Sequence, residues 1–155
     1  MLMKLFFLFF VSVLLSGCIK GESEIFLLPK NYTGYVLVLY NQKWTGAAVK
    51  YKRGKRVYEI PSNGIFKTRF LFEAGHSDFP KFYYEKIASE NRIPYKIYAR
   101  NIPVDTLVAF GGTVTNYGLK RGNYVILQSY YIGNRSQIDT IIEAADQINV
   151  ERLSD

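Results

Sequence analysis

The fold class of this chain follows from residues 61–72, PSNGIFKTRFLF. After a turn at Asn63-Gly64, side chains suited to a β-sheet core recur at every second position, and Lys67 and Arg69 fall between them. A strand places successive side chains on opposite faces, so this pattern predicts one face against a core and one face in water. The residues expected on the core face are Phe66, Thr68, Phe70 and Phe72.

Short runs of β-branched and aromatic residues, separated by Gly, Pro and Asn, continue on both sides of this stretch and predict further strands. The expected strands are 25–28, 35–40, 48–52, 56–60, 65–72, 81–86, 95–99, 106–115 and 124–132. The turns at 52–55 and 61–64 predict a three-strand meander, because Gly54 and Asn63-Gly64 tolerate positive φ. Residues 82–92 fit either a strand or a short helix. Gly111-Gly112 indicates a strand bulge or close packing.

Near the C-terminus the apolar period becomes helical, which predicts a helix over about 136–151 that covers an open face or edge of the sheet. Its apolar stripe is Ile138, Ile141, Ile142, Ala145 and Ile148. Ser136 is the expected N-cap, with Asp139 in the first turn. The prediction is therefore a mainly β protein, a single β-sandwich-like domain over 24–155 with one C-terminal α-helix.

The N-terminus carries Lys4 and then the apolar run 5–15, the charged start and short core of a secretory signal. Eleven residues cannot span a bilayer, which needs about 20. The run ends in Leu15-Ser16-Gly17-Cys18, which resembles the lipobox of bacterial lipoproteins. The resemblance implies that residues 1–17 are removed, that Cys18 receives the lipid that attaches the protein to a membrane, and that residues 18–23 form a short tether. Ile19 does not resemble the aspartate that retains lipoproteins at an inner membrane, which favours an outer membrane if the organism has one.

Two segments, 25–36 (IFLLPKNYTGYV) and 58–68 (YEIPSNGIFKT), resemble an uncharacterised family of small exported bacterial proteins and lipoproteins. The shared pattern is an apolar pair, Pro, two residues, Tyr, one residue and Gly, followed later by Ile-Pro-x-x-Gly, and it covers about residues 24–72. This resemblance implies no catalytic residue. Residues 46–49 and 63–66 are also similar to transthyretin-like β-sandwiches.

Charge is unevenly distributed along the chain. Residues 42–69 carry eight Lys and Arg against Glu59 alone, whereas residues 139–155 are acidic. Export argues against nucleic acid as a partner. A basic segment beside exposed Tyr suits a protein or glycan interface, although a solvated strand face explains the same pattern. The candidate interaction surface consists of Lys50, Lys52, Arg53, Lys55, Tyr83 and Tyr84.

Catalytic and metal motifs are sparse. His76 is the single histidine, and the single cysteine, Cys18, is assigned to lipid, so most triads and multi-histidine metal sites are excluded. Glu73, His76 and Asp78 could ligate a metal from one loop, but they also fit a polar turn. We therefore predict no catalytic residues, no metal and no cofactor.

Three functions remain open from the sequence. The first is a lipid-anchored, non-enzymatic binding or accessory module with a protein or glycan partner in the cell envelope. The second is an immunity or inhibitor lipoprotein that captures a secreted effector through the basic segment 42–69. The third is an envelope hydrolase that uses Glu73, Asp78 or Glu85, and a pocket that joins two carboxylates, with a raised pKa, would favour it.

Overall fold

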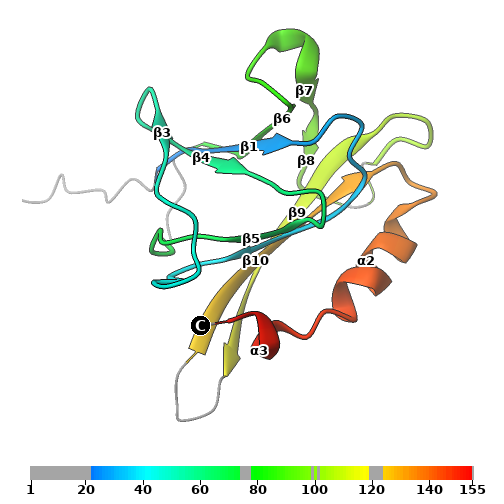
Figure 1. Ribbon diagram of the computed structural model, residues 1–155. Helices are drawn as coiled ribbons and strands as arrows, with labels where there is room; N and C mark the ends of the chain where they lie inside the picture. The colour runs from blue at the N-terminus through cyan, green and yellow to red at the C-terminus, as the bar shows by residue number, and fades with distance from the viewer. Residues whose placement is uncertain (1–21, 74–77, 99, 101, 119–123, 155) are drawn as a thin grey trace, which may run out of the picture.

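The computed structural model describes residues 22–73, 78–98, 100, 102–118 and 124–154. Two five-stranded sheets face each other in these residues (Figure 1), which confirms the mainly β, sandwich-like prediction. Sheet A has the order β3 (Tyr51–Lys52), β4 (Lys55–Glu59), β1 (Glu24–Leu28), β6 (Lys81–Tyr84), β7 (Arg92–Ile93). Sheet B has the order β5 (Ile65–Lys67), β2 (Gly34–Leu39), β10 (Tyr124–Gly133), β9 (Val108–Gly118), β8 (Tyr95–Lys96).

Both sheets are mixed. In sheet A, β1 pairs in parallel with β4 and β6, while β3 and β7 pair antiparallel at the edges. In sheet B, β10 lies antiparallel between β2 and β9, and the edge strands β5 and β8 are parallel to their neighbours. Successive strands therefore often lie in different sheets, so residues far apart in the sequence line the same interior.

The predicted meander is correct at its first turn and wrong at its second. Arg53-Gly54 joins β3 and β4 as a hairpin, but the turn at 61–64 carries the chain from β4 in sheet A to β5 in sheet B. Gly64 has φ +74°, and its carbonyl accepts a hydrogen bond of 2.8 Å from Leu37 N of β2. A Cβ on Gly64 would lie 2.1 Å from the Tyr35 carbonyl oxygen, so only glycine allows the turn to pack against β2.

Residues 65–72 form a shorter strand than predicted but keep the predicted alternation. Regular pairing ends at Lys67, and the side chain of Thr68 accepts a hydrogen bond of 3.1 Å from Phe70 N, which bends the chain. Thr68 and Phe70 are buried, Phe66 and Phe72 pack on the core, and the residues between them are partly or fully exposed. The predicted strand 48–52 is likewise reduced to β3.

Aromatic rings fill the centre of the space between the sheets. Phe26 of β1 stacks on Phe82 of β6, with ring centroids 4.7 Å apart, and meets Tyr58 of β4 and Tyr130 of β10 at 4.9 Å each. All four rings are at most 2% exposed. Rings from both sheets thus interlock, and such contacts add to the free energy gained by burying their surface.

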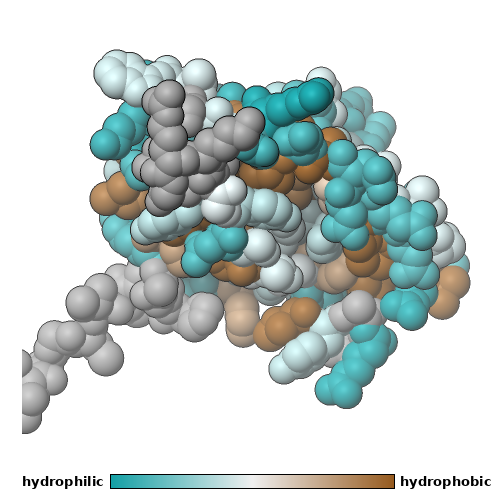
Figure 2. Space-filling model, turned by 90° about the horizontal axis from the view of Figure 1, so that it is seen from below, coloured by the Kyte–Doolittle hydropathy of each residue, from teal (hydrophilic) through white to brown (hydrophobic). Residues whose placement is uncertain are grey.

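Two helices cover the outer face of sheet B, as predicted for the apolar C-terminal stripe (Figure 1). They are α2 (Ile138–Asp146) and α3 (Val150–Leu153), so the predicted single helix over 136–151 is interrupted. Asn149 starts α3, since its side chain accepts a hydrogen bond of 3.1 Å from Arg152 N. Ser136 is not the N-cap, because Gln137 occupies that position and Ser136 Oγ donates to Asn134 instead. Figure 2, which views this side, shows hydrophilic side chains over most of it, with hydrophobic ones visible between them.

Two local predictions remain, for residues 82–92 and for Gly111-Gly112. Residues 82–92 form the end of β6, a 3-10 turn η1 (Ser89–Asn91) and the start of β7. Gly111 and Gly112 lie at a shift of register between β9 and β10, as expected of a bulge. No helix among the described residues is long and apolar enough to cross a membrane.

Candidate functional site

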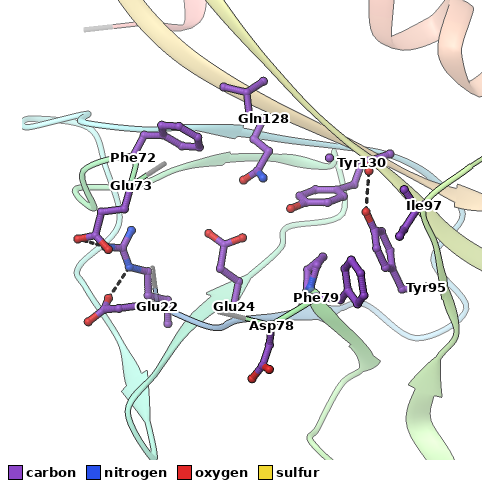
Figure 3. Close-up of a pocket in the computed structure, with 15 residues that line it drawn as sticks. Glu22, Glu24, Phe72, Glu73, Asp78, Phe79, Tyr95, Ile97, Gln128 and Tyr130 are labelled. Atoms are coloured by element: carbon purple, nitrogen blue, oxygen red, sulfur yellow. Dashed lines mark hydrogen bonds and ion pairs between the residues drawn. The ribbon is translucent and has the colours of Figure 1, made fainter. Parts of the chain in front are cut away.

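The sheets separate at the end where β1 and β4 begin, leaving a cleft of about 710 Å³, which we call the inter-sheet cleft (Figure 3). Both sheets and the segments that join them contribute to it. Its lining comprises Glu22, Glu24, Arg56, Phe72, Glu73, Asp78, Phe79, Pro80, Tyr95, Ile97, Gly111, Gly112, Val114, Gln128 and Tyr130. Such a volume is typical of small-molecule and cofactor sites.

Glu24 points into the cleft from the first position of β1 (Figure 3). It has the same parity on the strand as Phe26 and Leu28, so the pleat directs a carboxylate to the face that is otherwise core. Tyr58 Oη donates to Glu24 Oε1 at 2.8 Å, and Tyr40 Oη lies 3.0 Å from the same oxygen. Burial raises the pKa of Glu24 above its ordinary value in spite of these hydrogen bonds.

Gln128 and Tyr130 of β10 face Glu24 from sheet B. The side-chain oxygen of Gln128 lies 2.5 Å from Tyr40 Oη, so a continuous polar network joins the two sheets. Burial and the nearby carboxylate of Glu24 raise the pKa of the Tyr130 hydroxyl well above its usual range, which keeps it protonated and able to donate a hydrogen bond.

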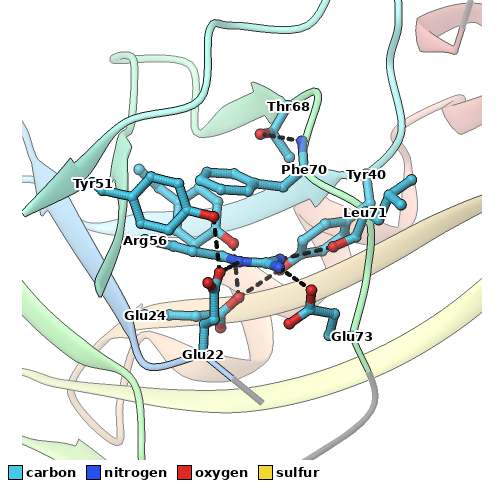
Figure 4. Close-up of polar contacts among 10 residues, drawn as sticks. Glu22, Glu24, Tyr40, Tyr51, Arg56, Thr68, Phe70, Leu71 and Glu73 are labelled. Carbon is cyan, nitrogen blue, oxygen red and sulfur yellow. Dashed lines mark hydrogen bonds and ion pairs between the residues drawn. The ribbon is translucent and has the colours of Figure 1, made fainter. Parts of the chain in front are cut away.

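Arg56 also lines the cleft, and Figure 4 shows the polar groups around it. Its guanidinium contacts Glu22 Oε2 at 2.6 Å, Glu73 Oε1 at 2.7 Å and the Leu71 carbonyl at 2.7 Å, and it lies 4.5 Å from the centre of the Phe70 ring. Burial alone would lower the pKa of Arg56, but its hydrogen bond to Glu22 and the nearby negative charges raise it. The same hydrogen bond lowers the pKa of Glu22. Arg56 is thus fully engaged by protein groups.

Aromatic rings form the third wall. Phe79 and Tyr95 lie with ring centroids 6.0 Å apart, and Tyr95 Oη donates to the Gly111 carbonyl at 2.7 Å. A Cβ on Gly112 would lie 3.2 Å from the Tyr130 ring, so glycine lets the strand approach these rings closely. Flat apolar surface thus lies opposite the acidic side of the cleft.

Among the residues that the structure describes, four carboxylates line the cleft and Arg56 is the single basic side chain of the lining. Two of them, Glu22 and Glu73, pair with Arg56. Asp78 accepts a hydrogen bond of 3.0 Å from Ser23 Oγ, lies 3.9 Å from Lys55 Nζ, and points away from the centre (Figure 3). Glu24 faces the open space, and no cationic side chain among the described residues forms an ion pair with it.

The residues of the predicted interaction surface are divided by the structure. Lys52, Arg53, Lys55 and Tyr83 surround a hollow of about 230 Å³ on the outer face of sheet A. Lys50 forms an exposed ion pair of 2.6 Å with Glu59. The sixth member, Tyr84, lies on the opposite face of β6, where it packs on the core and its hydroxyl donates to the Tyr32 carbonyl at 3.0 Å.

The residues considered for chemistry are also divided. Glu73 and Asp78 line the inter-sheet cleft, whereas Glu85 follows β6 elsewhere with φ +53°. Cys18 and His76 lie outside the described residues, as does the predicted signal 1–17. Within the described ranges no three His, Cys, Asp or Glu side chains are grouped to hold a metal ion.

Glu24, Arg56 and Gln128 were not among the site residues predicted from the sequence. The sequence held a sign of them, because each alternates in phase with a core residue of its strand: Glu24 with Phe26, Arg56 with Tyr58, and Gln128 with Tyr130. A charged residue in phase with core positions is uncommon, since a charge removed from water must be paired or hydrogen-bonded.

A family model described as a family of unknown function, DUF6843, matches residues 20–137. The chain belongs to this family, which agrees with the expectation of an uncharacterised family. Among solved structures, the chain is similar to a candidate lipoprotein from Bacillus anthracis, with 15% sequence identity, a TM-score of 0.47, and coverage of 72% of this chain and 71% of that one. No curated protein is significantly similar to the chain.

Proposed function

We propose that this member of the DUF6843 family is a lipid-anchored protein of the cell envelope, without catalytic activity, that binds a protein or glycan partner in the inter-sheet cleft. The lipobox-like residues before Cys18 support the anchor, and the residue after it favours an outer membrane where one exists. The cleft itself supports the binding role.

The observation that carries the proposal is that polar side chains line the inter-sheet cleft, where apolar side chains could have filled the space between the sheets. Glu24 and Gln128 come from different sheets and reach each other through Tyr40, and all three are held by hydrogen bonds within the protein. Burying these groups costs free energy relative to an apolar core, and preorganised polar groups in a cleft are what a specific binding site needs.

The chemistry of the lining suits a particular kind of ligand. Glu24 and Gln128 can accept hydrogen bonds from amino, guanidinium or hydroxyl groups, while Phe79 and Tyr95 offer flat surfaces for an apolar face. A basic peptide segment or an amino sugar of a glycan combines these features. A strongly anionic ligand would be repelled by the acidic side of the cleft.

The test is crosslinked capture of the native lipoprotein in its own envelope. Val114→Trp would fill the cleft from β9, where Val114 is 40% exposed, without changing the polar network. We expect one specific protein or glycan, lost in this variant and retained when Lys52 and Arg53 are reversed to Glu. Loss with the charge reversal, together with retention in Val114→Trp, would overturn the cleft as the binding site.

A second candidate is a hydrolase, and the raised pKa of Glu24 favours it. A carboxyl with a raised pKa is better suited than an ordinary one to act as a general acid, and Glu73 lines the same cleft. Incubation with purified peptidoglycan tests this reading. Product released by the native protein and abolished by Glu24→Gln would replace the binding module with an enzyme, and absence of product would favour the binding module.

A further inference from the structure

Exposed apolar side chains lie together at one end of the sandwich, around the start of β1. We define this tether end as Glu22, the loop 41–50, the turn 52–55 and the segment 68–73. Trp44 is 84% exposed there and Leu71 is 62% exposed. Hydrogen bonds hold these pieces together: Asn41 N donates to the Phe70 carbonyl at 2.9 Å, and Arg56 joins Glu22 to the Leu71 carbonyl.

The same end carries most of the basic segment found in the sequence. Its exposed basic side chains are Lys43, Lys50, Lys52, Arg53 and Arg69. The acidic groups beside them are engaged, since Glu22 and Glu73 both pair with Arg56. Figure 1 shows β3 and the loop after β2 on the same side of the molecule as the start of β1. Exposed Trp and Leu among Lys and Arg is the composition of surfaces that lie in a membrane interface.

The length of chain before the fold limits how far this end can be from the anchor. Three residues lie between Cys18 and Glu22, so a fully extended chain places Glu22 at most about 14 Å from Cys18. A lipid on Cys18 therefore places Glu22, where the tether end begins, within about 14 Å of the headgroups, which is close to the distance over which surface charge acts.

We propose that the tether end rests on anionic lipid headgroups, with Trp44 in the interfacial layer and Lys43, Lys52 and Arg53 beside the phosphates. This inference rests on the anchoring part of the proposed function. In this arrangement the lipid keeps the protein on the membrane, and the contact of the tether end with the headgroups fixes the orientation of the domain. The inter-sheet cleft begins at Glu22 and Glu73 of this same end, so its partner would approach along the membrane surface.

Trp44 is the single tryptophan of the chain, so its fluorescence reports the tether end directly. The probe is the mature chain 18–155, acylated at Cys18, in vesicles of equimolar phosphatidylglycerol and phosphatidylcholine. We expect a blue shift of Trp44 emission and quenching by lipids brominated on their acyl chains. The proposal would be overturned if the acylated protein remains bound to vesicles while aqueous iodide quenches Trp44 as strongly as it does in the unacylated chain.

A second arm separates the surface from the anchor. The unacylated mature chain with Cys18→Ala is sedimented with the same vesicles, and we expect salt-sensitive binding that requires phosphatidylglycerol. Lys52→Glu with Arg53→Glu should weaken it at least about tenfold, since each base contributes about 1 kcal/mol near an anionic surface. Binding that is equal on pure phosphatidylcholine, or unchanged by this reversal, would overturn the membrane surface.

The matched control reverses two exposed bases at the opposite end, Lys30 and Lys86, which flank the far ends of β1 and β6. Their reversal changes net charge equally and should leave vesicle binding within about twofold of the parent. An equal loss in both double variants would mean that net charge, and not the tether end, drives binding. If mass spectrometry shows no lipid on Cys18 while the unacylated chain still binds as expected, the anchor fails and the surface stands.

Discussion

The centre of the sandwich and the inter-sheet cleft are built by the same strands, yet their side chains change from aromatic to polar within two residues along each strand. On β1 Phe26 gives way to Glu24, on β4 Tyr58 gives way to Arg56, and on β10 Tyr130 gives way to Gln128. Both residues of each pair lie on the inward face of their strand. Aromatic residues at all six positions would extend the core without burying charge, so the polar end indicates a use other than stability.

The centre should respond most strongly to truncation. Phe26→Ala removes a ring that contacts Tyr58, Phe82 and Tyr130, and the interlocked sheets can collapse only partly into the space left. We expect a loss of about 4 kcal/mol in the free energy of unfolding. Chemical denaturation measures it, with Leu27→Ala on the partly exposed face of the same strand as the milder control. Equal losses would contradict a core centred on Phe26.

We expect the next largest loss of stability from a substitution in the turn at 61–64, because this turn carries the chain from one sheet to the other. Gly64→Ala meets the Tyr35 carbonyl and an unfavourable φ of +74°, so we expect about 3 kcal/mol of destabilisation. Gly54→Ala has a similar φ of +70° with open space around the Cβ, and should cost about 1 kcal/mol. Thermal unfolding of the two variants separates steric clash from backbone strain, and equal shifts would exclude the clash.

The ion pairs of the tether end should matter less than the aromatic centre. Arg56→Met keeps much of the packing on Phe70 but leaves Glu22 and Glu73 unpaired, and both carboxylates are partly exposed. We expect a loss of about 2 kcal/mol, below the range for fully buried pairs. Lys50→Met breaks the exposed pair with Glu59 and should cost less than about 0.5 kcal/mol. Urea midpoints of both variants test this order.

The smallest predicted effect is a difference in sign between the pH dependence of stability due to Glu24 and that due to Glu22. The pKa of Glu24 is raised in the folded protein, so its contribution to stability falls as pH rises from the ordinary value of 4.5 through the folded pKa. The pKa of Glu22 is lowered, so the stability it adds is present above 4.5 and is lost as pH falls through the folded pKa.

Variants at these two positions should therefore have opposite pH profiles. Relative to the parent, Glu24→Gln should become more stable as pH increases from 4 to 7 and Glu22→Gln less stable, which denaturation at a series of pH values measures. Parallel slopes would contradict the contrast drawn between the paired rim and the unpaired floor of the cleft.

Local patterns predicted much of this fold because they are set by single strands and helices. Alternation placed the side chains of 65–72 correctly, and the apolar stripe after Ile138 located the cover of sheet B. The turn at Gly64 was misread because its glycine serves packing against β2, a partner more than twenty residues earlier in the chain. Pairing of distant strands is decided by such tertiary contacts and not by the turn residues alone.

The candidate site was harder to predict because three of its key residues come from three strands of two sheets. Glu73 and Asp78 were named from the sequence and do line the cleft. Glu24 and Arg56 become noticeable only when their parity with Phe26 and Tyr58 is read as a direction toward the interior. The hollow among Lys52, Arg53 and Tyr83 was anticipated as a surface, but its hydrophobic floor at Ile25 was not.

The central claim, that the inter-sheet cleft receives a partner, is tested most directly by photo-crosslinking in the native envelope. A photoreactive residue would replace Ile97, which lines the cleft and is 47% exposed, or Val104, which is 66% exposed on the loop before β9. We predict that position 97 captures one specific partner and that position 104 does not. Capture of the same partner from position 104 alone would contradict the account.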